Sequence, residues 1–251
     1  MILQSLHDLY DRLADDPSYG IAPLGYSPQK IAFTVILKPD GTLFAIQDSR
    51  LKDDKGNLHA EAKLVLGKAK PSGSGLNPGL LWDNTTYMLG YKPEDPKPER
   101  TAKSFEAFRE RHLTLEKEIN CPAFSTVCRF LESWSPEIAA AYAIEHPILN
   151  ELVTGFGLFQ IQGEVKPVNQ QSKILTWWDN QATASSETGQ CLITGETLPI
   201  ARLHPKIKSV AGAQSSGASL VSFNAPAYES YRKDQSFNAP VSELAAFKYG
   251  T

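Results

Sequence analysis

The chain has 251 residues, of which 41% are hydrophobic and 21% charged, and it carries a net charge of −3. This size and composition indicate a soluble globular protein with one large domain or two small ones. No apolar run approaches the roughly 20 residues of a membrane helix, and the N-terminus lacks a signal-peptide pattern, so we expect a cytoplasmic protein without membrane contact.

The N-terminal part predicts a helix followed by a small sheet. Leucines recur at helical spacing over residues 2–14, which indicates an amphipathic helix. Residues 31–37 are rich in β-branched and aromatic side chains, the Pro-Asp-Gly sequence at 39–41 is typical of a turn, and 42–47 resume the strand pattern. We therefore expect a β-hairpin here, with a further strand at residues 63–66.

The middle third is predicted to be mainly helical. Residues 92–98 contain three prolines and are expected to form an exposed connector. Apolar side chains then recur at helical spacing over 104–119, 122–134 and 136–144, and a proline begins each of the last two helices. His112 lies on the apolar stripe of the first helix. We interpret it as a core residue and not a metal ligand, because no second ligand lies one turn away.

The last third mixes short elements with loops. Residues 155–163 predict a strand, 174–178 a short helix with two tryptophans, 191–194 and 218–223 strand-like pieces, and a further helix is expected to start at Val241.

The fold class is therefore α+β, without regular βαβ alternation. It comprises an N-terminal helix with a β-hairpin and small sheet, a mainly helical middle third, and a loop-rich mixed C-terminal third. We expect one domain over residues 1–251, with a subdivision into mixed α/β parts at 1–91 and 155–251 and a helical part at 99–154.

The segment of residues 202–240 combines cations, hydroxyls, carboxamides and glycines, and it states Ser-Phe-Asn-Ala-Pro twice, at 222–226 and 236–240. Residues 201–238 carry a net charge of +3, so the rest of the chain carries −6. A second stretch, 62–82, contains three lysines and no acid before a Gly/Ser-rich loop. Such runs are often solvated surface, and that alternative stays open.

The sequence partly matches several known catalytic and metal-binding motifs, but each match lacks at least one required residue. The glycine spacing of residues 212–219 matches a phosphate-binding loop, yet Ala218 stands where the lysine is required. A serine hydrolase needs a glycine two residues before and two residues after the nucleophile, but Ala213 stands before Ser215, and Gln214 and Ala218 flank Ser216. The three cysteines are too widely spaced for a zinc site or a disulfide framework, so we expect free thiols. Because none of these motifs is complete, we expect no cofactor and no enzyme activity.

The interpretation that remains is that the polar residues of segment 202–240 bind nucleic acid. Carboxamides can meet base edges, hydroxyls and backbone amides can hold phosphate oxygens, and glycine lets the main chain come close. The alternative, that these residues merely form turns while Phe223 and Phe237 fill the core, stays open.

Several motifs resemble a known family. They are Cys-Leu-Ile-Thr-Gly-Glu at 191–196, Pro-Ile-Ala-Arg-Leu-His-Pro-Lys-Ile-Lys at 199–208, Gly-Ala-Gln-Ser-Ser-Gly-Ala at 212–218, Val-Ser-Phe-Asn at 221–224 and Asn-Pro-Gly-Leu-Leu-Trp-Asp-Asn at 77–84. They resemble the large subunit of type I-C CRISPR Cascade, the Csd-type CRISPR-associated family. The resemblance spans nearly the whole chain and is most specific at 191–240.

The resemblance implies a noncatalytic subunit that recognises the protospacer-adjacent motif in double-stranded DNA, starts strand separation and helps recruit a separate helicase-nuclease. The implied partners are the target DNA, the RNA-processing and backbone subunits that carry the guide RNA, and the helicase-nuclease. Family members are considerably longer, so we expect this chain to be the N-terminal portion, without the C-terminal helical bundle. A scaffold that docks protein or guide RNA, with few DNA contacts, is the alternative.

The residues expected to contact DNA fall into two groups. In the C-terminal segment, cations would hold phosphates and carboxamides would approach base edges, and the earlier stretch would form a second DNA-facing edge. The two groups are Arg202, His204, Lys206, Lys208, Gln214, Ser215, Ser216, Asn224 and Asn238, and Lys68, Lys70, Ser72 and Asn77.

Overall fold

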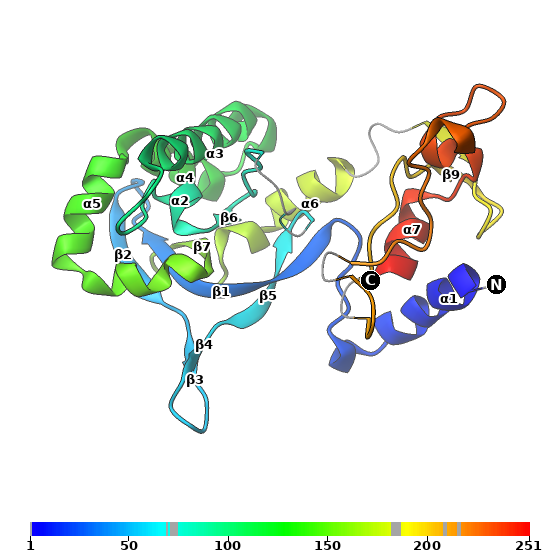
Figure 1. The fold of residues 1–251 in the computed structure, drawn as a ribbon. Helices are drawn as coiled ribbons and strands as arrows, with labels where there is room; N and C mark the ends of the chain where they lie inside the picture. The colour runs from blue at the N-terminus through cyan, green and yellow to red at the C-terminus, as the bar shows by residue number, and fades with distance from the viewer. Residues whose placement is uncertain (1, 69, 71–74, 182–186, 208–209, 215–216) are drawn as a thin grey trace. The chain divides into compact units, whose positions relative to one another are not determined.

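The computed structural model describes residues 2–68, 70, 75–181, 187–207, 210–214 and 217–251. The chain forms two compact units, which we call the central unit (Gly25–Asn180) and the terminal unit (Met1–Leu24 with Gln181–Thr251). Helices and strands occur together without regular βαβ alternation, so the α+β class is confirmed (Figure 1).

The sheet of the central unit is built on the long strand β1 (Tyr26–Leu37). Its first half pairs antiparallel with β5 (Glu61–Leu66), and its second half pairs antiparallel with β2 (Leu43–Asp48). On the other side β1 pairs in parallel with β7 (Phe156–Ile161), which pairs antiparallel with β6 (Trp82–Asp83). The strands predicted at 31–37, 42–47, 63–66 and 155–163 are thus confirmed.

The turn between β1 and β2 has the predicted chemistry. Gly41 adopts a φ of +95°, a conformation that side-chain-bearing residues rarely take. The Asp40 carboxylate accepts a hydrogen bond from the backbone N–H of Thr42 at 2.8 Å. A short hairpin that the sequence analysis did not predict follows β2, formed by β3 (Leu51–Lys52) and β4 (Leu58–His59).

The helices of the central unit lie on one side of the sheet and share its core (Figure 1). The Phe108 ring packs against Phe159 of β7 at a centroid distance of 6.3 Å, and Phe130 packs against the same ring at 5.9 Å. The three predicted helices of the middle third are confirmed. The helical elements are α2 (Thr85–Met88), α3 (Pro98–Ile119), α4 (Pro122–Ser133), α5 (Pro136–Glu145), η2 (Pro147–Thr154), η3 (Val168–Gln170) and α6 (Ser172–Gln181).

The terminal unit has a smaller core. Buried Cys191, Ala245 and Tyr249 belong to it, and Leu3 and Leu6 of the first helix pack against it. All three cysteines of the chain are buried free thiols. Its elements are α1 (Ile2–Ala14), η1 (Pro17–Tyr19), β8 (Thr188–Gln190), β9 (Thr197–Pro199), η4 (Pro226–Tyr228), η5 (Gln235–Asn238) and α7 (Glu243–Gly250).

Two strand predictions in the terminal unit are wrong. Residues 191–194 begin the turn that joins β8 to β9, with the Gly195 N–H donating to the Cys191 carbonyl at 2.8 Å. Within 218–223 only Ala218 pairs, in a single bridge to Ile207. In the first of these segments Leu192 is 61% exposed, so the apolar residues at 191–194 do not form a buried strand.

Candidate nucleic-acid interface

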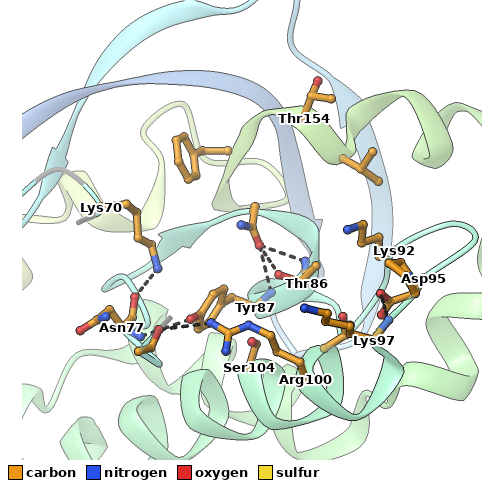
Figure 2. A pocket seen from close by; sticks show the side chains of 16 residues that line it. Lys70, Asn77, Thr86, Tyr87, Lys92, Asp95, Lys97, Arg100, Ser104 and Thr154 are labelled. Carbon is orange, nitrogen blue, oxygen red and sulfur yellow. Dashed lines mark hydrogen bonds between the residues drawn. The ribbon is translucent and has the colours of Figure 1, made fainter. Parts of the chain in front are cut away.

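A cleft of about 590 Å³ lies beside the first turns of α3 in the central unit (Figure 2). Lys92, Lys97 and Arg100 line it, together with Lys70, whereas Asp95 is its one lining acid among the described residues. Figure 2 shows Lys70 at one end of the cleft and Lys92 and Lys97 at the other. An adjoining cavity of about 530 Å³ shares Lys97 and Arg100 and adds Lys103. We call the surface formed by Lys92, Lys97, Arg100 and Lys103 the basic cleft.

The start of α3 adds to the positive potential of the basic cleft. Lys97 is the N-cap residue and makes no side-chain capping bond, and Pro98 occupies the first helical position. Asp95 accepts a hydrogen bond from the Lys97 backbone N–H at 2.9 Å. The N-terminus of this 22-residue helix carries a partial positive charge, which favours anions. The side chains of Lys92, Lys97, Arg100 and Lys103 are all exposed.

One wall of the cleft presents an amide donor. Asn84 caps α2, and its Oδ1 accepts hydrogen bonds from the backbone N–H groups of Thr86 at 3.1 Å and Tyr87 at 3.3 Å. Asn84 lines the cleft, and its Nδ2 group has no acceptor among the described residues. The same side chain therefore fixes the wall and leaves a donor for a ligand.

The predicted residue Lys70 lies at the cleft, but its charge is already matched. Its Nζ lies 2.5 Å from Oδ2 of Asp83 and 4.0 Å from the centroid of the Tyr87 ring, and it also donates to the Asn77 carbonyl. Asp83 is fully buried, and burial raises its carboxyl pKa even though Lys70 acts in the opposite direction. Lys70 therefore fixes the chain around Asn77 and Asp83.

The remaining residues of the earlier predicted group differ in their placement. Asn77 is exposed and lines the cleft, and its backbone N–H donates to the Tyr87 hydroxyl at 3.2 Å. Lys68 is exposed and does not line the cleft. Ser72 lies outside the described residues. The proposed DNA contacts of this group stay predictions.

In the terminal unit, Lys206, Gln214 and Asn224 are exposed. Their side chains make no hydrogen bond with the part of the chain that the structure describes. Two backbone hydrogen bonds between Ile207 and Ala218, of 2.9 and 2.8 Å, close the base of the loop that carries Gln214. Lys208, Ser215 and Ser216, also predicted to contact DNA, lie outside the described residues.

Three other predicted residues of the terminal unit are engaged internally. Arg202 donates to the Gln235 side chain at 2.8 Å, and His204 is hydrogen-bonded to the Tyr249 hydroxyl and stacked on its ring. Burial lowers the pKa of His204. Asn238 makes four hydrogen bonds to its own segment. The two copies of Ser-Phe-Asn-Ala-Pro thus place their asparagines differently, because Asn224 remains exposed.

The basic cleft was not predicted from the sequence. Acids at Glu94, Asp95 and Glu99 interrupt the cations of this stretch, so no run of positive charge marks it. The available signal was a set of cations on both sides of a proline that begins a long helix.

Comparison with known proteins links the chain to one family. A family model described as CRISPR-associated protein (Cas_Csd1) matches residues 6–251. No curated protein matches the chain. Within the described ranges, no helix has the length and apolarity to cross a membrane, and no three His, Cys, Asp or Glu side chains gather as metal ligands would.

Proposed function

Because the chain belongs to the CRISPR-associated protein family Cas_Csd1, we propose that it acts as the noncatalytic, DNA-binding large subunit of a type I-C Cascade complex. Family membership supports a Cascade-type subunit. The finer proposal is that the protein recognises the protospacer-adjacent motif of double-stranded DNA, assists strand separation and helps recruit the helicase-nuclease. Its partners would be the target DNA and the subunits that carry the guide RNA.

The observation that carries the proposal is the basic cleft. Four exposed cations and the N-terminus of α3 surround two adjoining hollows, whose described lining includes two acids, Asp95 and Glu99. Phosphate contacts contribute much of the affinity of proteins for DNA and position the duplex. An overall net charge of −3 agrees with a local patch and argues against a protein that coats DNA with its whole surface.

Motif recognition requires few base contacts, since guide pairing supplies most of the sequence information in RNA-guided complexes. Asn84 offers an amide donor at the cleft, and Gln214 and Asn224 offer exposed amides in the terminal unit. A free carboxamide such as that of Gln214 or Asn224 can donate to and accept from the edge of one base. Asn84 can only donate, because its Oδ1 already accepts from the backbone of α2. These three side chains are the candidates for base readout.

The double variant Lys97→Ala/Arg100→Ala tests the basic cleft. We expect weaker duplex binding and a plot of log affinity against log salt whose slope is smaller by about 2, because each lost phosphate contact removes about one unit. Binding of a labelled duplex across a salt series measures both quantities. Lys52→Ala/Lys55→Ala, which removes two exposed lysines of the β3–β4 hairpin, is the matched control. Equal slopes for the two double variants would reject the cleft as a phosphate site.

The exposed amides of the terminal unit give a separate prediction. Asn224→Ala or Gln214→Ala should reduce the preference for a motif-bearing duplex over a scrambled one by ~1–3 kcal/mol, with little effect on the salt slope. Lys206→Ala should instead lower the slope by about 1 and leave the preference unchanged. Competition binding with the two duplexes distinguishes these effects. An unchanged preference in both amide variants would assign base readout elsewhere.

A scaffold that docks protein or guide RNA is the second candidate. It is favoured by the internal hydrogen bonds of Arg202 and Asn238, which reduce the number of side chains available for DNA. A chain that fails to bind the duplex at any salt concentration would support the scaffold.

A further inference from the structure

A tight turn in the terminal unit holds two large residues in an unfavourable backbone conformation. The Lys233 N–H donates to the Ser230 carbonyl at 2.9 Å, and the two residues between them, Tyr231 and Arg232, have φ angles of 51° and 58°. Turns with positive φ at both central residues normally carry asparagine and glycine, because other side chains clash with the backbone there. Such strain persists only where the surroundings impose it.

The Asn238 side chain imposes this conformation. Its Oδ1 accepts from the backbone N–H and the hydroxyl of Ser230, at 2.8 and 3.1 Å. Its Nδ2 donates to the carbonyls of Lys233 and Gln235, at 2.6 and 2.9 Å. All its hydrogen-bonding capacity is therefore used on this turn and on Gln235, which follows it. Arg202 bonds the Gln235 side chain and holds the base of the turn from a distant part of the sequence.

The turn presents side chains that have no part in the core. Tyr231 is 94% exposed, and the next two residues, Arg232 and Lys233, are also exposed. A bulky aromatic residue in a strained position with almost no buried surface contributes nothing evident to folding. Its fixed presentation to solvent is what the Asn238 contacts achieve.

The chemistry of the tip fits an unpaired nucleobase. An aromatic ring stacks on the face of any base, and adjacent cations attract the phosphate chain that joins bases. Bases inside a duplex have both faces covered, so the fitting partner is a single strand. Glu229 and Asp234 flank the turn and balance its two cations, which makes stacking the main source of affinity.

We infer that the turn at residues 230–233 is a stacking platform on which Tyr231 receives an unpaired base of a single-stranded nucleic acid. The inference rests on the proposed function, because an unpaired base becomes available where DNA strands separate or where guide RNA is unpaired. It adds a contact for the open strand, distinct from the duplex contacts of the basic cleft.

The test measures how Tyr231→Ala changes affinity for a labelled single strand of about 15 nucleotides, as DNA and as RNA of the same sequence. We expect the affinity to fall about 5- to 150-fold, the range that corresponds to ~1–3 kcal/mol of base–aromatic stacking. Tyr231→Phe should retain the affinity, since the ring and not the hydroxyl makes the contact. Tyr228→Ala, which removes a 55% exposed tyrosine nearby, is the matched control and should have no effect. The strand that loses more affinity in Tyr231→Ala, DNA or RNA, identifies which nucleic acid supplies the unpaired base.

Tyr231→Asn separates binding from folding. Asparagine tolerates the positive φ angle, so this variant should keep or raise the melting temperature and still lose single-strand affinity. If both Tyr231→Ala and Tyr231→Asn bind the single strand with wild-type affinity, the inference is overturned, and the exposed ring would then be assigned to a protein contact. Duplex affinity, measured in parallel, reports on the basic cleft. A loss of duplex affinity in the cleft variants and a loss of single-strand affinity in the Tyr231 variants are therefore independent results.

Discussion

Replacing Asp83 with alanine is expected to lower the free energy of unfolding of the central unit by about 3–5 kcal/mol, because it leaves a buried ion pair without one partner. Asp83 is fully buried and receives hydrogen bonds from the backbone N–H groups of Gly79 and Asn84, each at 2.8 Å. The Lys70 side chain, which is 21% exposed, would lose its carboxylate partner. The two backbone donors would then lack an acceptor, and Lys70 would retain only the Asn77 carbonyl and the Tyr87 ring as partners.

The measurement of this change is denaturant unfolding followed by tryptophan fluorescence. All four tryptophans of the chain lie within the central unit, so their signal reports on that unit. Asp54→Ala, which removes an exposed carboxylate, is the matched control and should shift stability by no more than about 0.5 kcal/mol. Similar shifts for the two variants would show that the Lys70–Asp83 pair does not hold this region.

The same substitution also tests the architecture of the basic cleft. Asp83 and Lys70 connect β6 to the carbonyl of Asn77, and Asn84, which follows Asp83, caps α2 beside the cleft. Loss of the pair should therefore loosen the wall that carries the Asn84 amide donor. Lys70 thus contributes to the candidate interface by positioning its neighbours, and the DNA contact expected for it from the sequence stays a prediction.

Elements with long or alternating apolar patterns could be predicted from the sequence. The hairpin around Gly41 was marked by its turn residues, and α3, α4 and α5 by apolar spacing and by prolines at their starts. The strand-like interpretation of 191–194 failed because a short apolar run has no periodicity of its own. Here the backbone turns, so that Cys191 is buried in the core and Ile193 packs against it, whereas Leu192 is exposed.

The candidate site could be predicted less well, because a sequence shows charges but not which of them are paired. Lys70 and Lys206 look equivalent in the sequence, yet the first is matched by a buried carboxylate and the second is exposed. Asn224 and Asn238 occupy the same position of a repeated pentapeptide, yet only the second supports a strained turn. Folding decides such differences through contacts distant in sequence.

His112 is expected to make the stability of the central unit fall steeply in mild acid. Its ring is fully buried, with Nδ1–H donating to the Phe108 carbonyl at 2.7 Å and Nε2 accepting from the Leu81 N–H at 3.0 Å. The Leu81 bond requires a neutral ring, since a protonated histidine has no acceptor. Burial is the main cause that lowers the pKa of His112 to about 3 from an ordinary 6.5.

The sign of the pH dependence follows from the lowered pKa. Between pH 6.5 and 3 the unfolded chain binds a proton at this histidine that the folded chain does not, so acid favours unfolding. The contribution of His112 is complete above pH 6.5 and is lost as the pH falls, by about 2 kcal/mol between pH 6.5 and 4.5. Carboxylates titrate in the same range, so a comparison between variants must isolate this residue.

His112→Gln provides that comparison, because glutamine can still accept from the Leu81 N–H but does not titrate. Its unfolding free energy, measured by tryptophan fluorescence from pH 7 to 4.5, should decline less than that of the wild type by about 2 kcal/mol. His59→Gln, an exposed histidine of β4, should leave the wild-type slope unchanged. If the glutamine variant is too unstable to measure, the wild-type His112 ring proton signal should show no titration down to pH 4.5. A midpoint near 6.5 in that signal would mean that the ring is not held neutral by burial, and the tie between α3 and Leu81 would then have to tolerate a charged histidine.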